Sequence, residues 1–399
     1  MSVRISTLNS YNTGVDVLQR RQAAMAESQE QLTSGKRVMR ASDDPSAAAR
    51  AERAIAAIAR TDTARRAVGA SESLMRESEG ALADAVALLQ SARETMVAAG
   101  NAGYSDAERK GLAEKIRAVR AQLLEVANRS DGAGTWVFGG QGAGAPPFVD
   151  APGGVQYGAT PGVLTTAEGL QLSTDGRASW MSAPTGNGVF ETRADAGVRG
   201  AWIGPGQVTD PAALTGDTYR IVFDVDAAGV TTYAVLQNGA PTAVTAAPYV
   251  SGQAIAIDGM AVQVTGVPAD GDGFDLVPSA AANNPFAVLD AAATDLETAG
   301  RSGPQVAQTV SDALRDLDSV MVTMQAQRTA VGEALVRVDT ETSRLDSQEI
   351  RAKTERSNAE DLDMVEALSE FQLRQTGYDA ALKSYSMVQR LSLFDYLNR

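Results

Sequence analysis

The chain has 399 residues, of which 35 are basic and 49 are acidic, so its formal net charge is −14. That length allows two or three domains, and the acidic balance argues against nucleic-acid binding. Because the sequence contains no histidine and no cysteine, disulfides, metal or haem sites that use those ligands, and Ser-His-Asp or Cys-His catalysis are excluded. We therefore expect no metal, no cofactor and no enzymatic activity.

The sequence also lacks membrane and secretion signals. No run of 18 apolar residues predicts a membrane-spanning helix, so no membrane partner is expected. The first 21 residues contain no apolar core of the kind found in a cleaved secretory signal, so we expect none.

The N-terminal stretch has the periodicity of a long amphipathic helix. Gln22 and Gln29 fall at two positions of an otherwise apolar row with 3/4/7 spacing. The apolar members of that row are Leu8, Tyr11, Val15, Leu18, Met25 and Leu32. Gly35 follows directly and is expected to end the helix, because glycine tolerates the left-handed conformation found after helix C-termini.

A turn to a second helix is expected at residues 40–45. Its members are Arg40, Asp43, Asp44 and Pro45, and Asp44 before Pro45 fits an N-cap followed by proline at the first helical position. The second helix is predicted to run to about Gly100. The two adjacent carboxylates also invite an acid–base interpretation, but a capped turn is favoured because no third catalytic group accompanies them.

The centre of the chain has a different composition. Twelve of the 14 prolines and 24 of the 37 glycines fall within residues 136–285, which carry 4 basic and 13 acidic residues. Helices exclude proline and disfavour glycine, so we expect strands and turns here. Alternating residues predict one hairpin over 219–236 and another over 253–265. The centre is therefore predicted to be an antiparallel β-rich domain.

The C-terminal part returns to helical spacing. Apolar residues from Val310 to Leu345 keep heptad steps over about five heptads, which predicts a helix of about 50 residues. A last stripe comprises Leu368, Phe371, Tyr378, Leu382, Tyr385, Val388 and Leu391, with Phe394 beyond it. The fold class is thus α+β, with long antiparallel helical arms from both termini around the central β domain. The two terminal stripes are expected to pair with each other and then with neighbouring subunits.

Several motifs carry a resemblance to the bacterial flagellin superfamily. Ser34–Val38 with Arg40–Pro45 resembles its first helical turnaround, and residues 124–129 with 132–140 and 147–148 resemble the exit from its N-terminal helices. Residues 391–397 and 266–274 resemble the hook–filament junction members of that superfamily.

The resemblance implies a structural protein of the flagellum. It implies export of the unfolded chain by the flagellar type III apparatus and assembly outside the cell as a ring of its own copies. The first hook-associated protein would lie on the hook side and flagellin on the filament side, and a cytoplasmic export chaperone would bind before export. The residue set of the two terminal stripes would form the subunit and chaperone interface.

The resemblance also implies a division into five segments. Residues 1–45 and 358–399 would form an inner tube domain, residues 46–135 and 286–357 a helical bundle domain, and residues 136–285 the β domain.

Other functions stay open. One alternative is a flagellin-type filament subunit, and another is a carboxylate enzyme or a sugar-binding β domain on a helical stalk, with Trp136, Trp180 and Trp202 as candidate stacking residues. Residues 270–273 suggest a calcium loop, but Ala281 stands where an EF-hand needs glutamate, so tight turns are favoured. Residues 139–144 lack the register of a phosphate-binding glycine motif.

Overall fold

The computed structural model describes the backbone of residues 7–132, 134–167 and 169–397, and the side chains of residues 12–387 within those ranges. The chain divides into two compact units. We name residues 1–66 with 341–399 the terminal unit, and residues 67–340 the central unit. The helices are α1 Thr7–Ser34, α2 Pro45–Ala99, α3 Asp106–Ala127, α4 Gly176–Trp180, α5 Pro285–Glu297, α6 Gly303–Glu360 and α7 Met364–Leu397.

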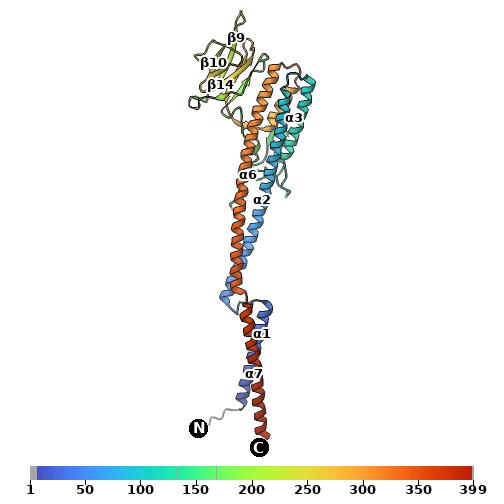
Figure 1. Ribbon diagram of the computed structural model, residues 1–399, viewed down its shortest axis with the longest axis vertical. Coiled ribbons are helices and arrows are strands. Elements are labelled where there is room, and N and C mark those ends of the chain that lie inside the picture. Colours follow the sequence, from blue (N-terminus) through green and yellow to red (C-terminus); the bar gives the residue numbers. More distant parts are fainter. Residues whose placement is uncertain (1–6, 133, 168, 398–399) are drawn as a thin grey trace. The chain divides into compact units, whose positions relative to one another are not determined.

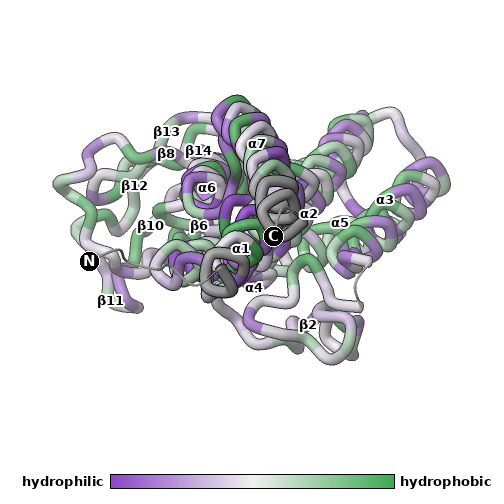
Figure 2. The backbone as a smooth tube through the Cα atoms, turned by 90° about the horizontal axis from the view of Figure 1, so that it is seen from below, coloured by the Kyte–Doolittle hydropathy of each residue, from purple (hydrophilic) through white to green (hydrophobic). Residues whose placement is uncertain are grey.

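In the terminal unit, α1 and α7 run antiparallel and side by side (Figures 1 and 2). Gly35 ends α1 with φ of 69°, as predicted, and its N–H donates to the Gln31 carbonyl oxygen at 2.8 Å. Three backbone hydrogen bonds then join this turn to the turn between α6 and α7, including one of 3.4 Å from the Val38 N–H to the Glu360 carbonyl. Arg37 donates to Glu360 at 2.7 Å, and Leu362 donates to Gly35 at 3.0 Å.

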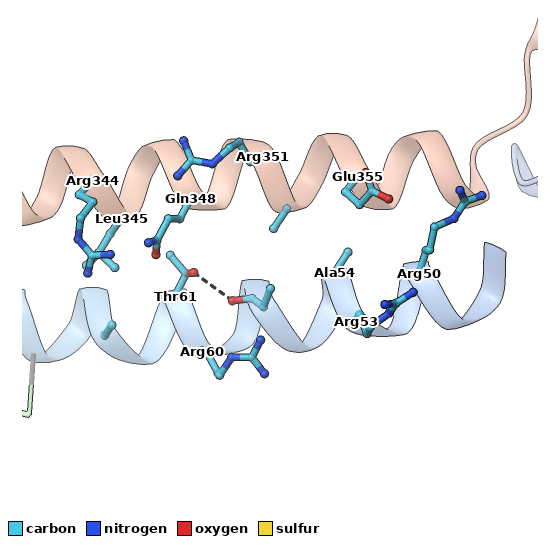
Figure 3. Close-up of a pocket in the computed structure, with 13 residues that line it drawn as sticks. Arg50, Arg53, Ala54, Arg60, Thr61, Arg344, Leu345, Gln348, Arg351 and Glu355 are labelled. Carbon is cyan, nitrogen blue, oxygen red and sulfur yellow. Dashed lines mark hydrogen bonds between the residues drawn. The ribbon is translucent and has the colours of Figure 1, made fainter. Parts of the chain in front are cut away.

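The first part of α2 and the last part of α6 also belong to the terminal unit. Arg65 of α2 forms ion pairs with Asp346 and Glu349 of α6. Small residues of α2 such as Ala54 face α6, and a groove of 790 Å³ lies between the two helices (Figure 3). The helix predicted from Pro45 to about residue 100 and the long C-terminal helix are both confirmed.

The central unit packs α3 and α5 beside its portions of α2 and α6. The capping box between Ser105 and Glu108 begins α3. Arg120 of α3 then pairs with Asp290 of α5 at 2.9 Å. The apolar faces of these helices supply the core residues Leu82, Leu89, Met96, Ile116, Leu123, Leu289, Leu317 and Met324, all fully buried.

The strands all lie in the central unit. They are β1 Phe148–Ala151, β2 Gly154–Tyr157, β3 Leu164–Thr165, β4 Gln171–Leu172, β5 Ala183–Pro184, β6 Phe190–Ala194, β7 Ala201–Ile203, β8 Gln207–Val208, β9 Tyr219–Val225, β10 Thr231–Gln237, β11 Ala240–Pro241, β12 Ala247–Pro248, β13 Ala254–Ile257, β14 Met260–Gly266, β15 Gly273–Pro278 and β16 Ala281–Asn283. The larger sheet has the order β11-β10-β9-β15-β6, with β12 also on β10. A second sheet has the order β13-β14-β7, with β8 also on β14.

Both predicted hairpins are confirmed. β9 pairs antiparallel with β10, and β13 pairs with β14 so that Ile257 lies opposite Met260. The two residues between them, Asp258 and Gly259, have φ of 38° and 79°, the left-handed conformation that a tight two-residue hairpin needs. Residues of both sheets then share one buried cluster, from Phe190 to Leu276 in sequence. This is a two-sheet sandwich.

A separate aromatic cluster lies outside that sandwich. Trp180 stacks on Phe286 of α5 at 5.9 Å between ring centroids, and Phe138 and Phe148 approach Trp180 at 5.5 and 5.8 Å. Thus the β1–β2 hairpin and α4 pack on the helices instead of joining the sandwich core. The composition of residues 136–285 did not distinguish these two environments.

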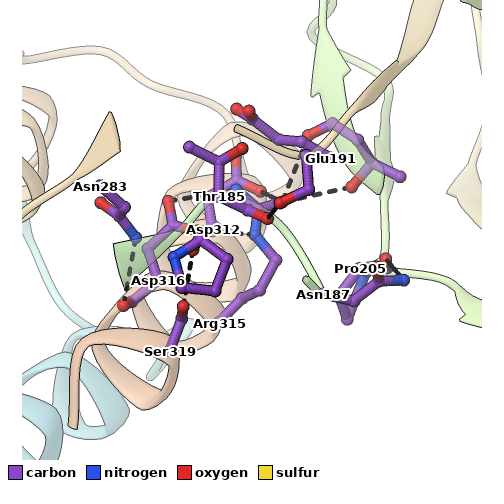
Figure 4. Close-up of polar contacts among 12 residues, drawn as sticks. Thr185, Asn187, Glu191, Pro205, Asn283, Asp312, Arg315, Asp316 and Ser319 are labelled. Atoms are coloured by element: carbon purple, nitrogen blue, oxygen red, sulfur yellow. Dashed lines mark hydrogen bonds and ion pairs between the residues drawn. The ribbon is translucent and has the colours of Figure 1, made fainter. Parts of the chain in front are cut away.

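Side chains of α6 form hydrogen bonds with backbone groups of the strands. Gln308 accepts from the Ile203 N–H at 2.8 Å and donates to the Ile203 carbonyl at 3.2 Å, which satisfies the outer edge of β7. Arg315 donates to the Thr192 carbonyl at 3.2 Å and is nearly buried between two aspartates of its own helix (Figure 4). Ser319 donates to the Pro184 carbonyl at 2.6 Å.

We predict that Gln308→Ala destabilises the central unit by about 1–3 kcal/mol, because it leaves the buried N–H and carbonyl of Ile203 without partners. Urea unfolding followed by tryptophan fluorescence measures the loss. Gln325→Ala, at an exposed site on the same helix, is the matched control and should change stability by less than about 0.5 kcal/mol. Equal losses in both variants would contradict the assignment.

Candidate assembly surface

The terminal helices meet along an apolar seam. On α1, Val15, Leu18, Met25 and Leu32 are half-buried. On α7, Phe371, Tyr378 and Tyr385 are half-buried as well. Gly14 shows how close the helices come, since a Cβ added there would lie 3.1 Å from the Tyr385 ring. The predicted pairing of the two terminal helices is therefore observed.

Polar contacts fix the register of this pair. Arg374 donates to the hydroxyl of Ser28 at 2.7 Å and to the carbonyl of Ala24 at 3.1 Å. The interpretation of Gln22 and Gln29 as members of the α1 seam is wrong, because both are exposed and Ser28 is the buried polar residue. Arg374 lies three residues after Phe371 and four before Tyr378, so heptad spacing places it on the seam, and only its charge kept it out of the predicted apolar stripe.

The predicted C-terminal stripe divides into two faces. Leu368 and Leu382 do not join the seam; their exposed fractions are 52% and 47%. Four further apolar residues of α7 are also exposed, and sequence analysis did not select them: Met364, Val365, Leu373 and Met387. Figure 2 shows apolar and polar residues mixed around α7 instead of segregated. One face of α7 thus contacts α1, while apolar side chains on the others meet solvent.

The remaining candidate interface residues lie outside the described side chains. They are Leu8, Tyr11, Val388, Leu391 and Phe394.

The turn before α2 is a carboxylate-capped junction. The side chain of Asp44 accepts from the N–H groups of Ser46 at 3.1 Å and Ala47 at 2.9 Å, and Pro45 is the first helical residue, as predicted. These bonds, that of Ala47 first, lower the pKa of Asp44 from 3.8 to about 2. Asp43 accepts from the Arg40 N–H at 2.8 Å, which lowers its pKa as well.

Both carboxylates are therefore occupied by backbone donors, which supports a structural turn over an acid–base pair. Arg37 links this turn to α6, because it pairs with Asp44 at 3.4 Å and donates to the Ala359 carbonyl at 3.0 Å.

Of the three predicted stacking residues, Trp180 is buried, whereas Trp136 and Trp202 are half-buried. Trp180 is 1% exposed within the aromatic cluster, so it offers no stacking face to a sugar. Asp272 accepts from the Ala269 N–H at 2.8 Å, which makes a tight turn with Gly271 at φ of 81°. Among the residues whose side chains are described, no group of three or more Asp or Glu residues is placed to hold a metal ion. No described helix is long and apolar enough to cross a membrane.

Two family models match the helical regions of this chain. The bacterial flagellin N-terminal helical region matches residues 5–143, and the bacterial flagellin C-terminal helical region matches residues 314–397. Together these ranges cover more than half of the chain, including α1, α2, α3 and α7.

Individual relatives point to the flagellum as well. Flagellar hook-associated protein 3 of Salmonella typhimurium is 34% identical over 158 residues, which are 39% of this chain and 49% of that protein. Flagellin of Bacillus subtilis is 31% identical over 129 residues, 32% of this chain and 41% of that protein. The chain therefore spans about half, or less, of the length of these relatives.

A solved structure also has a fold similar to that of this chain. The flagellar junction protein FlgL from Legionella pneumophila has a TM-score of 0.66 and 27% identity, and the match covers 72% of this chain and 98% of that one. The relatives named here are flagellar proteins, in agreement with the expectation that the chain is not an enzyme.

We predict that Asp44→Asn keeps the cap but removes part of the acid sensitivity of the terminal unit. Because folding lowers the pKa of Asp44, its contribution to stability is complete above about pH 4 and is lost as the pH falls towards 2. Circular dichroism melts between pH 7 and 2.5 should show a smaller decline in Asp44→Asn than in wild type. Asp62→Asn, at an exposed site of α2, is the control. Identical pH profiles of Asp44→Asn and wild type would contradict this assignment.

Proposed function

This chain belongs to the bacterial flagellin family, and we propose that it is the structural subunit that forms the junction between the hook and the flagellin filament. The family models and the likeness to a junction protein over 98% of that protein's solved chain support this proposal. Because the chain matches only about half of hook-associated protein 3, the location and the partners given below are proposals about this chain.

The observation that carries the proposal is the apolar surface left on α7. A helix with apolar residues on several sides is stable only when several sides are covered. The α1 seam covers one of them, and Leu368, Leu373 and Leu382 stay exposed. Burying each such side chain contributes roughly 1.5–3 kcal/mol. Packing of the α1–α7 pair against the same pair in neighbouring copies supplies the missing cover.

The partners are those that the resemblance to junction proteins implies. Copies of the chain form a ring in which residues 1–45 and 358–399 line an inner tube, residues 46–135 and 286–357 form the surrounding bundle, and residues 136–285 form an outer β domain. The first hook-associated protein contacts the ring on the hook side, and flagellin contacts it on the filament side. The chain leaves the cell unfolded through the flagellar type III apparatus, and a cytoplasmic chaperone covers α7 before export.

A filament subunit is the second candidate, and the match to Bacillus subtilis flagellin favours it. The two functions predict different locations of the chain in the flagellum. Immunogold labelling of isolated flagella should mark only the hook–filament boundary, and deletion of the gene should release flagellin monomers into the medium while hooks persist. Label along the whole filament would overturn the junction function in favour of the filament one.

We predict that Leu382→Asp and Leu391→Asp each weaken both chaperone binding and junction assembly at least tenfold. A buried charge in place of a leucine removes more than the 1.4 kcal/mol that corresponds to one decade of affinity. Calorimetric titration of the chaperone and immunoblots of isolated flagella measure the two effects.

Val235→Asp is the matched control, because Val235 is buried in the sandwich. It should impair folding of that domain and leave chaperone affinity unchanged. Unchanged affinity in both α7 variants, or an equal loss in Val235→Asp, would show that α7 is not the shared docking surface.

A further inference from the structure

The groove between α2 and α6 in the terminal unit is rich in arginine. Arg50, Arg53 and Arg60 line it from α2, and Arg344 and Arg351 from α6. Ala54, Ala57, Ala64, Leu345 and Ala352 give it a largely apolar lining. Small alanine side chains leave the space that the groove occupies, and arginine stems extend along its sides.

Most of these arginines have no counter-ion. Arg344 pairs with Glu341 on its own helix. In the part of the chain that the structure describes, Arg50, Arg60 and Arg351 form no ion pair, and Arg53 donates only to the Ala49 carbonyl at 3.1 Å. Glu355 is the single acidic residue of the lining. Nearby Arg65, in contrast, is neutralised by two carboxylates.

The spread of the arginines indicates the size of the ligand. Figure 3 shows Arg50 extending towards α6 and Arg344 extending towards α2, while Arg60 and Arg351 lie on the outer sides of the helix pair. Along α2 the lining runs from Arg50 to Ala64, fourteen residues of helix or about 21 Å at 1.5 Å per residue. That span is too long for one phosphate-sized anion, and it fits a protein surface that carries several carboxylates.

The charge of the chain supplies such a surface. The terminal unit has 19 basic and 18 acidic residues, a net charge of +1, whereas the central unit has 16 basic and 31 acidic residues, a net charge of −15. Carboxylates such as Glu94, Glu333 and Asp339 are exposed in the central unit, and none of them forms an ion pair among the described residues. The terminal unit as a whole is close to neutral, but the arginine groove within it is complementary in charge to the acidic central unit of another copy.

We propose that the arginine groove of one copy binds the acidic surface of the central unit of a second copy. This contact rests on the proposed assembly of copies into a ring, and it adds a second interface to the apolar one on α7. Arginine stays protonated at any physiological pH, so the groove keeps its charge during export and assembly.

Zero-length cross-linking tests the contact in assembled flagella. Arg50→Lys and Arg53→Lys place an amine in the groove at constant charge, and a carbodiimide joins such an amine to a carboxylate in direct contact. Copies labelled with heavy nitrogen are mixed with unlabelled ones during assembly. The expected product joins the substituted position to an Asp or Glu of residues 67–340 in a copy with the other label. It should fall at least fivefold when the salt is raised from 0.05 to 0.5 M before coupling.

Charge reversal gives an independent measurement. Arg50→Glu combined with Arg53→Glu should reduce incorporation into flagella at least tenfold, while circular dichroism shows unchanged helix content. Lys115→Glu, at an exposed position of the central unit, is the control and should assemble normally.

Cross-links confined to one copy, or joined to another flagellar protein instead of a second copy, would overturn the inference. Normal assembly of the doubly reversed variant would overturn it too and would leave the junction function intact. If the wild-type chain is absent from the junction, the proposed function fails, and the same cross-linking on the polymer that the chain does form still decides the inference.

Discussion

The backbone pairing of residues 35–37 with residues 360–362 is the contact on which the terminal unit depends. It joins the turn after α1 to the turn before α7, so two segments more than 300 residues apart in sequence meet as neighbours. Glu360, nearly buried, forms ion pairs with Lys36 at 3.2 Å and with Arg356 at 2.6 Å, which compensate its own negative charge. From this point α1 and α7 run antiparallel, which brings Ser28 opposite Arg374 and Gly14 opposite Tyr385.

A two-helix hairpin of this kind has little stability of its own. Helices in water gain most of their stability from tertiary packing of an apolar face, and here only one face of α7 is packed. The exposed leucines of α7 are therefore unfavourable in a single copy and favourable in an assembly. The same property suits export of an unfolded chain, because a marginal terminal helix costs little to unfold. The sandwich core lies between its own two sheets, so its stability does not depend on packing against other copies.

Sequence patterns predicted the long helices, the turn at Asp44 and both hairpins, because each depends on local chemistry: heptad spacing, a cap before proline, and alternating strand residues on either side of a glycine-containing turn. They predicted less where a residue acts through a distant partner. Gln308 satisfies an edge strand 105 residues away, and Arg374 reaches a serine 346 residues away. The division of the C-terminal stripe was also missed, since spacing identifies apolar residues but not which of them a single partner helix covers. From the sequence, Trp180 was a candidate for stacking on a sugar ligand. Its packing on Phe286 shows that it is a core residue.

The charge distribution sets the geometry that repeated copies can adopt. Central units with a net charge of −15 repel one another, so an arrangement that pairs like with like is disfavoured at low ionic strength. Contact between the arginine groove of one copy and the central unit of the next joins two different surfaces of the chain. Such a heterologous contact, repeated by rotation, closes into a ring or continues as a helix, whereas a twofold contact would stop at a dimer. In the proposed ring, the apolar face of α7 would provide affinity in any orientation, and the proposed contact of the arginine groove would provide the direction that a ring between two different flagellar segments requires.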